Sequence, residues 1–456
     1  MRSGRSLIVL LVLALGLGAY IYFVENKRDV SETEKKDKVF TVDADKIEEI
    51  EAKASGGDVS TLKKNGSTWQ VVAPVNAAAD ESNVGSMVSA LASAEVTRVL
   101  DEHPANVSGF GLDPARYSVA FRAAGDAAQH RLNVGDKTPT GSDVYARVEG
   151  QTKVILIPSY TAESLNRTPF DLRDKTVLKF EQDKVDLITL EPAGAPKIAL
   201  VKKGEDWRLT APLDVRADAS PVDALVSRLA QAQMKSVDLE GTDPTPAQLK
   251  TFGLDKPPIV ATIGAGSTRA TLQLGGKKGD VAVYARDLSR KIVFSVESSL
   301  TTDLTKKVDD LRIKDVFAFK AYTAKTLEIA HAGASFSFAK SAPPTAANAT
   351  SSPVDVWKET KPDAKDVNAT AMTDLLNTLS SLRAEKFADK APASGDDIVI
   401  AVKAGDTGAE TDEHLTLRKA AGQAYAIRAG EPGAAVVPVA DVDKALEQLK
   451  ALTTAK

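Results

Sequence analysis

The 456-residue sequence contains no cysteine. This absence excludes disulfide bonds, thiolate metal sites, cysteine nucleophiles and the lipidated cysteine of a lipoprotein. Cysteine-free chains suit an oxidising compartment, although they are compatible with the cytoplasm as well. Histidine is also scarce, and no two of the four residues have the spacing of a metal-ligand pair: His103, His130, His331 and His414.

The chain also lacks an excess of positive charge and the common catalytic motifs. Its net charge of −4 gives no electrostatic reason to expect nucleic-acid binding. There is no dinucleotide-binding or P-loop glycine pattern, no Gly-x-Ser-x-Gly and no His-Glu-x-x-His. The glycine-rich stretches at 264–266 and 274–280 indicate hairpin turns, and the Asp-Asp pairs at 309–310 and 396–397 indicate solvated surface. The sequence therefore predicts no catalytic, cofactor or metal site.

What the chain does have is a long uncharged run at its N-terminus. Arg2 and Arg5 precede the 19 uncharged residues 6–24. A helix of this length, at about 1.5 Å per residue, spans nearly the ~30 Å hydrocarbon core of a bilayer. We expect residues 1–24 to be an uncleaved, single-pass transmembrane anchor. A cleaved signal peptide is the alternative, which the bulky residues at 20–24 fit poorly.

A charged segment follows the apolar run. Ten of the fourteen residues 25–38 are charged, five of each sign, which predicts a solvated stalk. The basic residues after the span outnumber the two before it, which favours a cytoplasmic C-terminal part, but long domains translocate largely regardless of charge. The short basic N-terminus is typical of an export signal. We expect an inner (cytoplasmic) membrane anchor with a periplasmic, extracytoplasmic C-terminal part.

Most of the chain consists of one unit in three copies. The segment 69–74 (Trp-Gln-Val-Val-Ala-Pro) recurs as 207–212 and, more loosely, as 357–362. Apolar residues with i, i+3, i+4, i+7 spacing follow each copy and predict an amphipathic helix: Val84, Met87, Val88 and Leu91; Val222, Leu225, Val226 and Leu229; Met372, Leu375, Leu376 and Leu379. Either of two repeated sets would cap these helices: Asp80, Asp218 and Asn368, or Ser82, Ser220 and Thr370.

Short alternating runs separated by glycine and aspartate complete each copy and predict antiparallel strands. Phe-Gly-Leu-Asp, at 110–113 and 252–255, is absent from the third copy and indicates a turn. We therefore predict an α+β fold: an N-terminal transmembrane helix and then three tandem repeats, each a mostly antiparallel β-sheet with two helices. The predicted modules are residues 39–178, 179–317 and a diverged 318–456, whose insert at 341–353 indicates a flexible surface loop.

Repeated aromatic and arginine residues are the candidates for a binding surface. The three tryptophans of the chain recur with the modules, and so does a tyrosine followed by an arginine. More weight falls on core packing for the tryptophans and on cross-strand packing for the Tyr-Arg pairs. The candidate residues are Trp69, Trp207, Trp357, Tyr145, Arg147, Tyr284, Arg286, Tyr425 and Arg428.

These motifs resemble the bacterial family called domain of unknown function 4340. The resemblance rests on Trp-x-Val-x-x-Pro followed by a capped helix, then Phe-Gly-Leu-Asp-x-Pro, then Val-Tyr-Ala-Arg, and it is strongest over residues 40–178 and 180–319. It implies an N-terminal membrane helix, an envelope location and an accessory role, often beside an ABC-type exporter of the gliding-motility auxiliary kind. It carries over no catalytic residue.

We expect a non-enzymatic membrane-anchored envelope protein, an accessory or scaffold subunit for an ABC-type transporter or another envelope complex. The reason is a repeated scaffold without a repeated polar constellation. An extracytoplasmic module that binds a polysaccharide or a lipid is the alternative, and a mixed-charge groove lined by Trp and Tyr would favour it. An enzyme is the weakest reading, because the motif search found nothing to support it.

Overall fold

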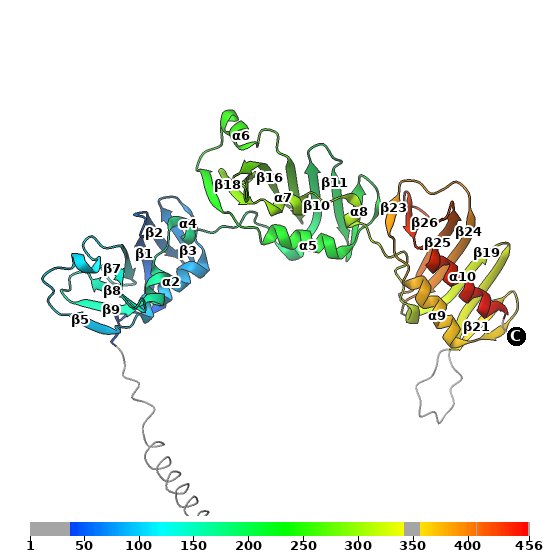
Figure 1. Ribbon diagram of the computed structural model, residues 1–456, viewed down its shortest axis with the longest axis horizontal. Coiled ribbons are helices and arrows are strands. Elements are labelled where there is room, and N and C mark those ends of the chain that lie inside the picture. The colour runs from blue at the N-terminus through cyan, green and yellow to red at the C-terminus, as the bar shows by residue number, and fades with distance from the viewer. Residues whose placement is uncertain (1–36, 342–355, 407, 455–456) are drawn as a thin grey trace, which may run out of the picture. The chain divides into compact units, whose positions relative to one another are not determined.

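Three antiparallel β-sheets make up the computed structural model, which describes residues 37–341, 356–406 and 408–454 (Figure 1). Each sheet has nine strands and is accompanied by helices, so the predicted α+β class and the three repeats are confirmed. The predicted anchor at 1–24, most of the stalk and the insert beyond Ser341 lie outside the described residues. No helix within the described ranges is long and apolar enough to cross a membrane.

The first module contains strands β1 to β9 in the order β4-β3-β2-β1-β6-β7-β8-β9-β5. Its strands are β1 (Ile47–Lys53), β2 (Val59–Asn65), β3 (Thr68–Ala73), β4 (Ala77–Ala78), β5 (Arg98–Asp101), β6 (Tyr117–Ala123), β7 (His130–Lys137), β8 (Asp143–Val148) and β9 (Val154–Pro158). Its helices are η2 (Ala44–Lys46), α2 (Glu81–Ser93), η3 (Ser108–Phe110), α3 (Ser159–Leu165) and α4 (Pro169–Leu172).

The second module repeats this order as β13-β12-β11-β10-β15-β16-β17-β18-β14. Its strands are β10 (Val185–Pro192), β11 (Ile198–Lys203), β12 (Asp206–Ala211), β13 (Val215–Arg216), β14 (Ser236–Glu240), β15 (Ile259–Ala265), β16 (Thr268–Lys278), β17 (Ala282–Asp287) and β18 (Ile292–Glu297). Its helices are η4 (Gln182–Lys184), α5 (Ala219–Ala230), α6 (Pro246–Phe252), α7 (Ser299–Leu304) and α8 (Val308–Leu311).

The third module has the order β22-β21-β20-β19-β24-β25-β26-β27-β23. Its strands are β19 (Ala324–His331), β20 (Ala334–Ser341), β21 (Val356–Lys361), β22 (Lys365–Val367), β23 (Lys386–Ala388), β24 (Asp396–Ala404), β25 (Thr411–Ala420), β26 (Gln423–Arg428) and β27 (Ala434–Val437). Its helices are η5 (Ala321–Thr323), α9 (Ala369–Ser380) and α10 (Val439–Thr454). The prediction of two α-helices per module holds here, whereas the first two modules carry additional short helices.

The strand order explains why each module needs its long helix. Four strands run outward by hairpins from the centre of the sheet to one edge. The helix then carries the chain across the sheet to the opposite edge strand. The remaining four strands fill the space between, so that β6 pairs with β1 at the centre, β15 with β10 and β24 with β19.

The long helices begin where the first of the two predicted cap sets places them. The side chains of Asp80, Asp218 and Asn368 accept hydrogen bonds of 3.0 Å from the backbone N–H groups of Asn83, Ser220 and Ala371. Such a side chain satisfies one of the backbone donors left free in the first turn of a helix. The predicted apolar faces of α2, α5 and α9 are buried, which confirms their helical periodicity.

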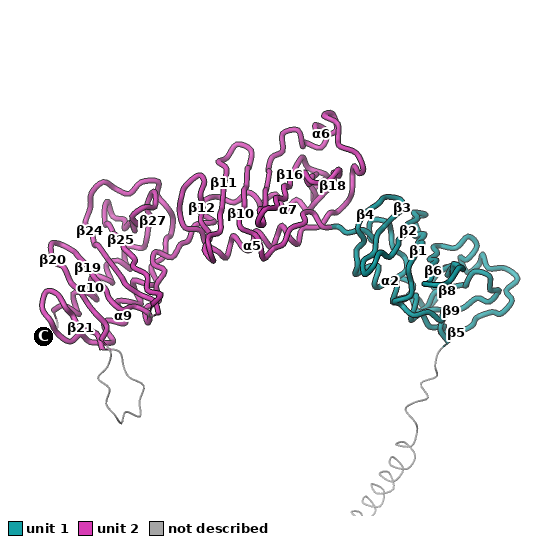
Figure 2. Tube along the Cα trace, turned by 180° about the vertical axis from the view of Figure 1, so that it is seen from behind, with its two compact units in different colours: residues 1–175 teal, residues 176–456 magenta. Residues whose placement is uncertain are grey.

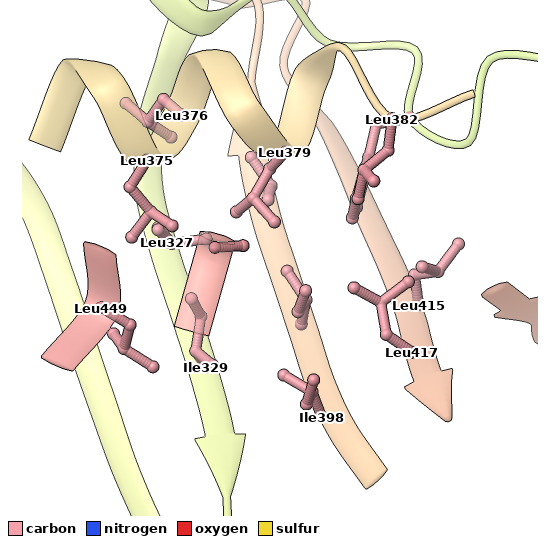
Figure 3. Packing of buried hydrophobic residues seen from close by; sticks show 14 of the residues in the cluster. Leu327, Ile329, Leu375, Leu376, Leu379, Leu382, Ile398, Leu415, Leu417 and Leu449 are labelled. Atoms are coloured by element: carbon pink, nitrogen blue, oxygen red, sulfur yellow. The ribbon is translucent and has the colours of Figure 1, made fainter. Parts of the chain in front are cut away.

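Leucine and isoleucine side chains fill the core of each module between the helices and one face of the sheet. In the third module, Leu375 and Leu379 of α9 pack toward Leu327 of β19 and Leu417 of β25, and Leu449 of α10 joins them (Figure 3). A separate cluster fills the first module, with Met87 and Leu91 of α2 at its centre. Each module therefore has a core of its own.

The chain divides into two compact units, residues 1–175 and residues 176–456 (Figure 2). The division lies three residues before the predicted end of the first module. The second unit contains two of the nine-stranded sheets. Residues 311–316 connect these two sheets: Ile313 donates to the carbonyl of Arg216 in the second module, and Val316 donates to that of Leu382 in the third.

Candidate functional site

The three tryptophans are buried. Trp69, Trp207 and Trp357 lie on β3, β12 and β21, and only 8%, 4% and 4% of their surfaces are exposed. The indole Nε1 of Trp207 donates to Asp223 on α5 at 3.1 Å. The Trp207 ring therefore joins sheet to helix, and the burial of all three rings agrees with the core packing that the sequence favoured.

A lysine lies opposite each tryptophan on the neighbouring strand, and it was not among the predicted candidates. Lys64 pairs with Trp69, Lys202 with Trp207 and Lys340 with Trp357. In the second module the Lys202 ammonium lies 6.0 Å from the centre of the indole ring. The signal was present in the sequence, because a lysine stands five residues before each of the first two tryptophans.

The Phe-Gly-Leu-Asp loop and the repeated tyrosine contact each other in the first two modules. The ring centres of Phe110 and Tyr145 are 4.9 Å apart, and so are those of Phe252 and Tyr284. The tyrosine points to the sheet face opposite the core, because its neighbours Ala146 and Ala285 point inward. The Phe-Gly-Leu-Asp loop and the repeated tyrosine thus form one structural unit, although they lie far apart in the sequence.

A glycine in the adjacent strand makes room for this loop. A Cβ atom at Gly135 would overlap the carbonyl oxygen of Phe110, and one at Gly275 would overlap that of Phe252. The β7–β8 and β16–β17 pairings both shift register beside these glycines. The β25–β26 pairing of the third module has no such shift, and Tyr425 there donates instead to Gln423 at 2.7 Å. Loop, bulge and ring contact are lost together.

The three arginines do not occupy equivalent positions, so the predicted Tyr-Arg pair is wrong for Arg428. Arg147 pairs with Asn133 and Arg286 with Gln273, whereas Arg428 pairs with Leu415, the equivalent of Leu272. One extra residue after the tyrosine moves Arg428 to the opposite, inner face of its strand, because side chains alternate along a strand. Of the other two, Arg286 lies 3.5 Å from Asp243.

On that inner face Arg428 forms a partly buried ion pair that holds the chain entering the third module. It donates to Glu413 and to the carbonyl of Val316, both at 2.8 Å. Glu413, of which 7% is exposed, also accepts from the backbone N–H groups of Ala318 and Phe319. The charged groups of Arg428 and Glu413 therefore satisfy backbone polar groups, which is a structural role.

The second module fills the same role with different residues. Arg290 donates to the carbonyls of Thr176 and Val177 and to the buried Asp287. Asp287 pairs with Leu272 and so stands where Arg428 stands in the third module. The repeats do not show this correspondence in the sequence, because an acid stands at the position of Arg428 and the arginine comes from the turn after β17.

A hollow with mixed chemistry lies in the third module, lined by residues of η5, β20, β21 and α9. Its volume is about 650 Å³. Trp357 and Leu376 line it, with Phe319 at the start of the module. Three α9 residues contribute polar groups: Thr373, Asn377 and Ser380.

The rim of this groove is basic and aromatic. Tyr322 is 70% exposed, and Lys320 is exposed beside it. Lys340 donates to the carbonyl of Tyr322 at 3.2 Å. None of the lining residues, all of which the structure describes, is acidic. Of the predicted candidates, only Trp357 belongs to this groove.

No group of three or more metal-binding side chains occurs in the part of the chain that the structure describes. His130 contacts Asp126 at 2.7 Å and His331 contacts Asp396 at 2.9 Å, both as two-residue pairs near the surface.

The fold and these contacts define a protein built from tandem α+β modules, each with its own core. The family model described as "Domain of unknown function (DUF4340)" matches residues 69–206 and again residues 207–397. The chain therefore belongs to this family. Both matches begin on a repeated tryptophan, so the matched unit starts at the third strand of a sheet and runs into the next module. No curated protein and no solved structure matches the chain.

Proposed function

We propose that this chain is a non-enzymatic, membrane-anchored envelope protein that serves as an accessory or scaffold subunit of an ABC-type transporter or another envelope complex. One observation carries the proposal. What the three modules repeat is strand order, helix caps and core residues, while exposed positions differ: Tyr322 of the third module stands where the first two have Asp45 and Asp183. Repeated modules of this kind present an extended surface for binding, and a partner can bind selectively to the part of that surface that differs between modules.

Affinity purification of the full chain from native membranes tests this role. We expect subunits of an ABC-type transporter, identified by mass spectrometry, to be recovered in constant proportion to the chain. A variant that lacks residues 318–456 should test whether the diverged third module carries the contact. Recovery of the chain without any membrane-protein partner under gentle solubilisation would contradict the scaffold role.

A fusion of alkaline phosphatase to the C-terminus tests the proposed orientation separately. An active fusion is expected if the modules are extracytoplasmic. An inactive but stable fusion would place them in the cytoplasm, as the positive charges after the apolar run favour.

The binding of a ligand is a second candidate function, because a specific feature favours it. The groove of the third module combines Trp357, an exposed Tyr322 and two lysines around a hollow large enough for a small molecule.

A further inference from the structure

The groove of the third module lies beside a 3-10 helix that recurs in all three modules. In each module a 3-10 helix (η2, η4 or η5) follows the first phenylalanine of the module and lies against the long helix. This 3-10 helix begins with Ala44 in the first module, with Gln182 in the second and with Ala321 in the third. The second and third modules differ in the length of the side chain at this position.

In the second module a long side chain spans this gap. The amide of Gln182 donates to the hydroxyl of Ser227 on α5 at 2.9 Å. In the third module the position is Ala321, whose methyl group cannot reach Asn377, the α9 residue equivalent to Ser227. The short side chain leaves α9 uncovered here.

The groups around this opening are suited to a polar ring. The Tyr322 side chain is 70% exposed, although it lines the same groove as the buried Trp357. An exposed aromatic face packs well against the C–H face of a ring that has no charge on it. The side-chain amide of Asn377 offers two donors and an acceptor, and the hydroxyls of Thr373 and Ser380 retain acceptor capacity after donating to α9 carbonyls.

The charge of the groove selects among polar ligands. Lys320 and Lys340 line it, and no acidic residue does. Lysine ammonium groups form charge-assisted hydrogen bonds with carboxylates, about twice as strong as bonds between neutral groups. A ligand with a sugar-like ring and a carboxylate would match all three features: the exposed Tyr322, the polar side chains of α9 and the two lysines.

We propose that this groove binds a saccharide that carries a carboxylate group, as uronic acids and lactyl-substituted amino sugars do. The sugar ring lies against Tyr322, its hydroxyls contact Asn377 and Thr373, and its carboxylate lies between the two lysines. An extended proline-rich peptide would also use aromatic rings, but it brings neither the hydroxyls for the α9 side chains nor a negative charge for the lysines.

This inference gives the ligand class of the second candidate function and is independent of the scaffold role. The same purified full chain is therefore used in both tests. If the chain recovers transporter subunits but binds no saccharide, only the saccharide site is rejected. If it binds a saccharide but recovers no transporter subunit, only the scaffold role is rejected.

Titration calorimetry of the full chain with three acidic probes tests the proposal. The probes are trigalacturonic acid, a hyaluronan tetrasaccharide and N-acetylmuramic acid, with maltotriose as the neutral comparison. We expect at least one acidic probe to bind about tenfold more tightly than maltotriose, a ratio that corresponds to about 1.4 kcal/mol. Tyr322→Ala and Lys340→Ala should each weaken it about tenfold or more.

Ala321→Gln provides the sharpest variant, because it introduces the side chain that spans the gap in the second module. It adds a polar group without removing any residue of the groove, and it should abolish binding while the chain stays folded. Lys202→Ala, at the equivalent of Lys340, and Tyr160→Ala, which removes another exposed tyrosine, should leave binding unchanged.

Three outcomes would overturn the proposal. The first is that none of the acidic probes binds the folded chain. The second is binding that Tyr322→Ala and Ala321→Gln leave unchanged. The third is displacement of a bound acidic probe by a neutral proline-rich peptide at equal concentration, which would assign the groove to a peptide.

Discussion

At the scale of single residues, the tryptophans connect each sheet to its long helix. Trp207 shows this best, since its ring is 96% buried on β12 and its Nε1 reaches Asp223 on α5. A large ring at this position fills volume that no neighbouring side chain can reach, and the hydrogen bond satisfies its one polar atom.

Trp207→Ala is expected to destabilise the second module by about 3–5 kcal/mol, because it leaves a cavity and removes the partner of Asp223. Chemical denaturation followed by far-UV circular dichroism measures the loss. Tyr160→Ala, at an exposed position, is the control. An unchanged unfolding midpoint for Trp207→Ala would mean that the ring is not part of the core.

Glu410 has a lowered pKa and should therefore keep its charge in more acid solution than an ordinary glutamate does. Lys325 lies 2.6 Å from its carboxylate, and the backbone N–H of Gly408 donates to it at 3.1 Å. These contacts lower the pKa of Glu410 from 4.5 to about 2, with the Lys325 hydrogen bond as the largest cause. Its stabilising contribution is therefore fully present above about pH 4.5 and is lost as the pH falls toward 2.

NMR titration of the side-chain carboxyl carbon, assigned with Glu410→Gln, checks this prediction. The midpoint is expected near pH 2 in the native chain and should rise toward 4.5 in Lys325→Ala. A midpoint near 4.5 in the native chain would show that the ion pair does not persist in solution.

At the scale of elements, one loop and one glycine determine each other. Phe110 lies against Tyr145, and the backbone of the loop approaches β7 so closely that residue 135 must be glycine. The third module has neither the loop nor the bulge. The two features therefore occur together or not at all.

Gly135→Ala is expected to destabilise the first module by about 1–3 kcal/mol, because its methyl group collides with the Phe110 carbonyl and displaces the loop. The matched control is Gly85→Ala in α2, where no atom lies near the new methyl group. That change should stabilise the same module by about 0.5–1 kcal/mol. Thermal unfolding of both variants measures the two effects. Equal melting temperatures would contradict the close approach of the Phe110 carbonyl to residue 135.

At the scale of the whole molecule, side chains as well as residues 311–316 connect the second and third modules. The guanidinium of Arg312 lies 3.6 Å from the ring centre of Phe387 on β23, and burial lowers its pKa. Arg216 donates to Glu431 at 2.9 Å. These contacts lie inside one compact unit and join two independent cores.

Phe387→Ala should weaken this junction by about 0.5–2 kcal/mol, the usual range for a cation–π contact. Hydrogen exchange at the backbone amides of Ile313 and Val316, which donate across the junction, is expected to become faster. Val399→Ala, at a 49% exposed position of the same module, is the control. Exchange rates that match those of the control variant would mean that Arg312 and Phe387 contribute nothing to the connection.

The sequence by itself determined the class of fold, the three copies and the long helices, because periodic apolar residues and capping side chains act locally. It also identified the motifs that make the family recognisable. Three tryptophans and a repeated tyrosine marked positions that matter for packing, without showing against what they pack.

Only the tertiary structure decided which residues meet. The pairing of Phe110 with Tyr145, the opposed roles of Asp287 and Arg428, and the opening beside Ala321 depend on strand register and on contacts between residues distant in the chain. A shift of one residue along a strand moves a side chain to the other face, and no local pattern records it. The candidate groove is therefore a property of the folded third module, in which a missing side chain is as informative as those present.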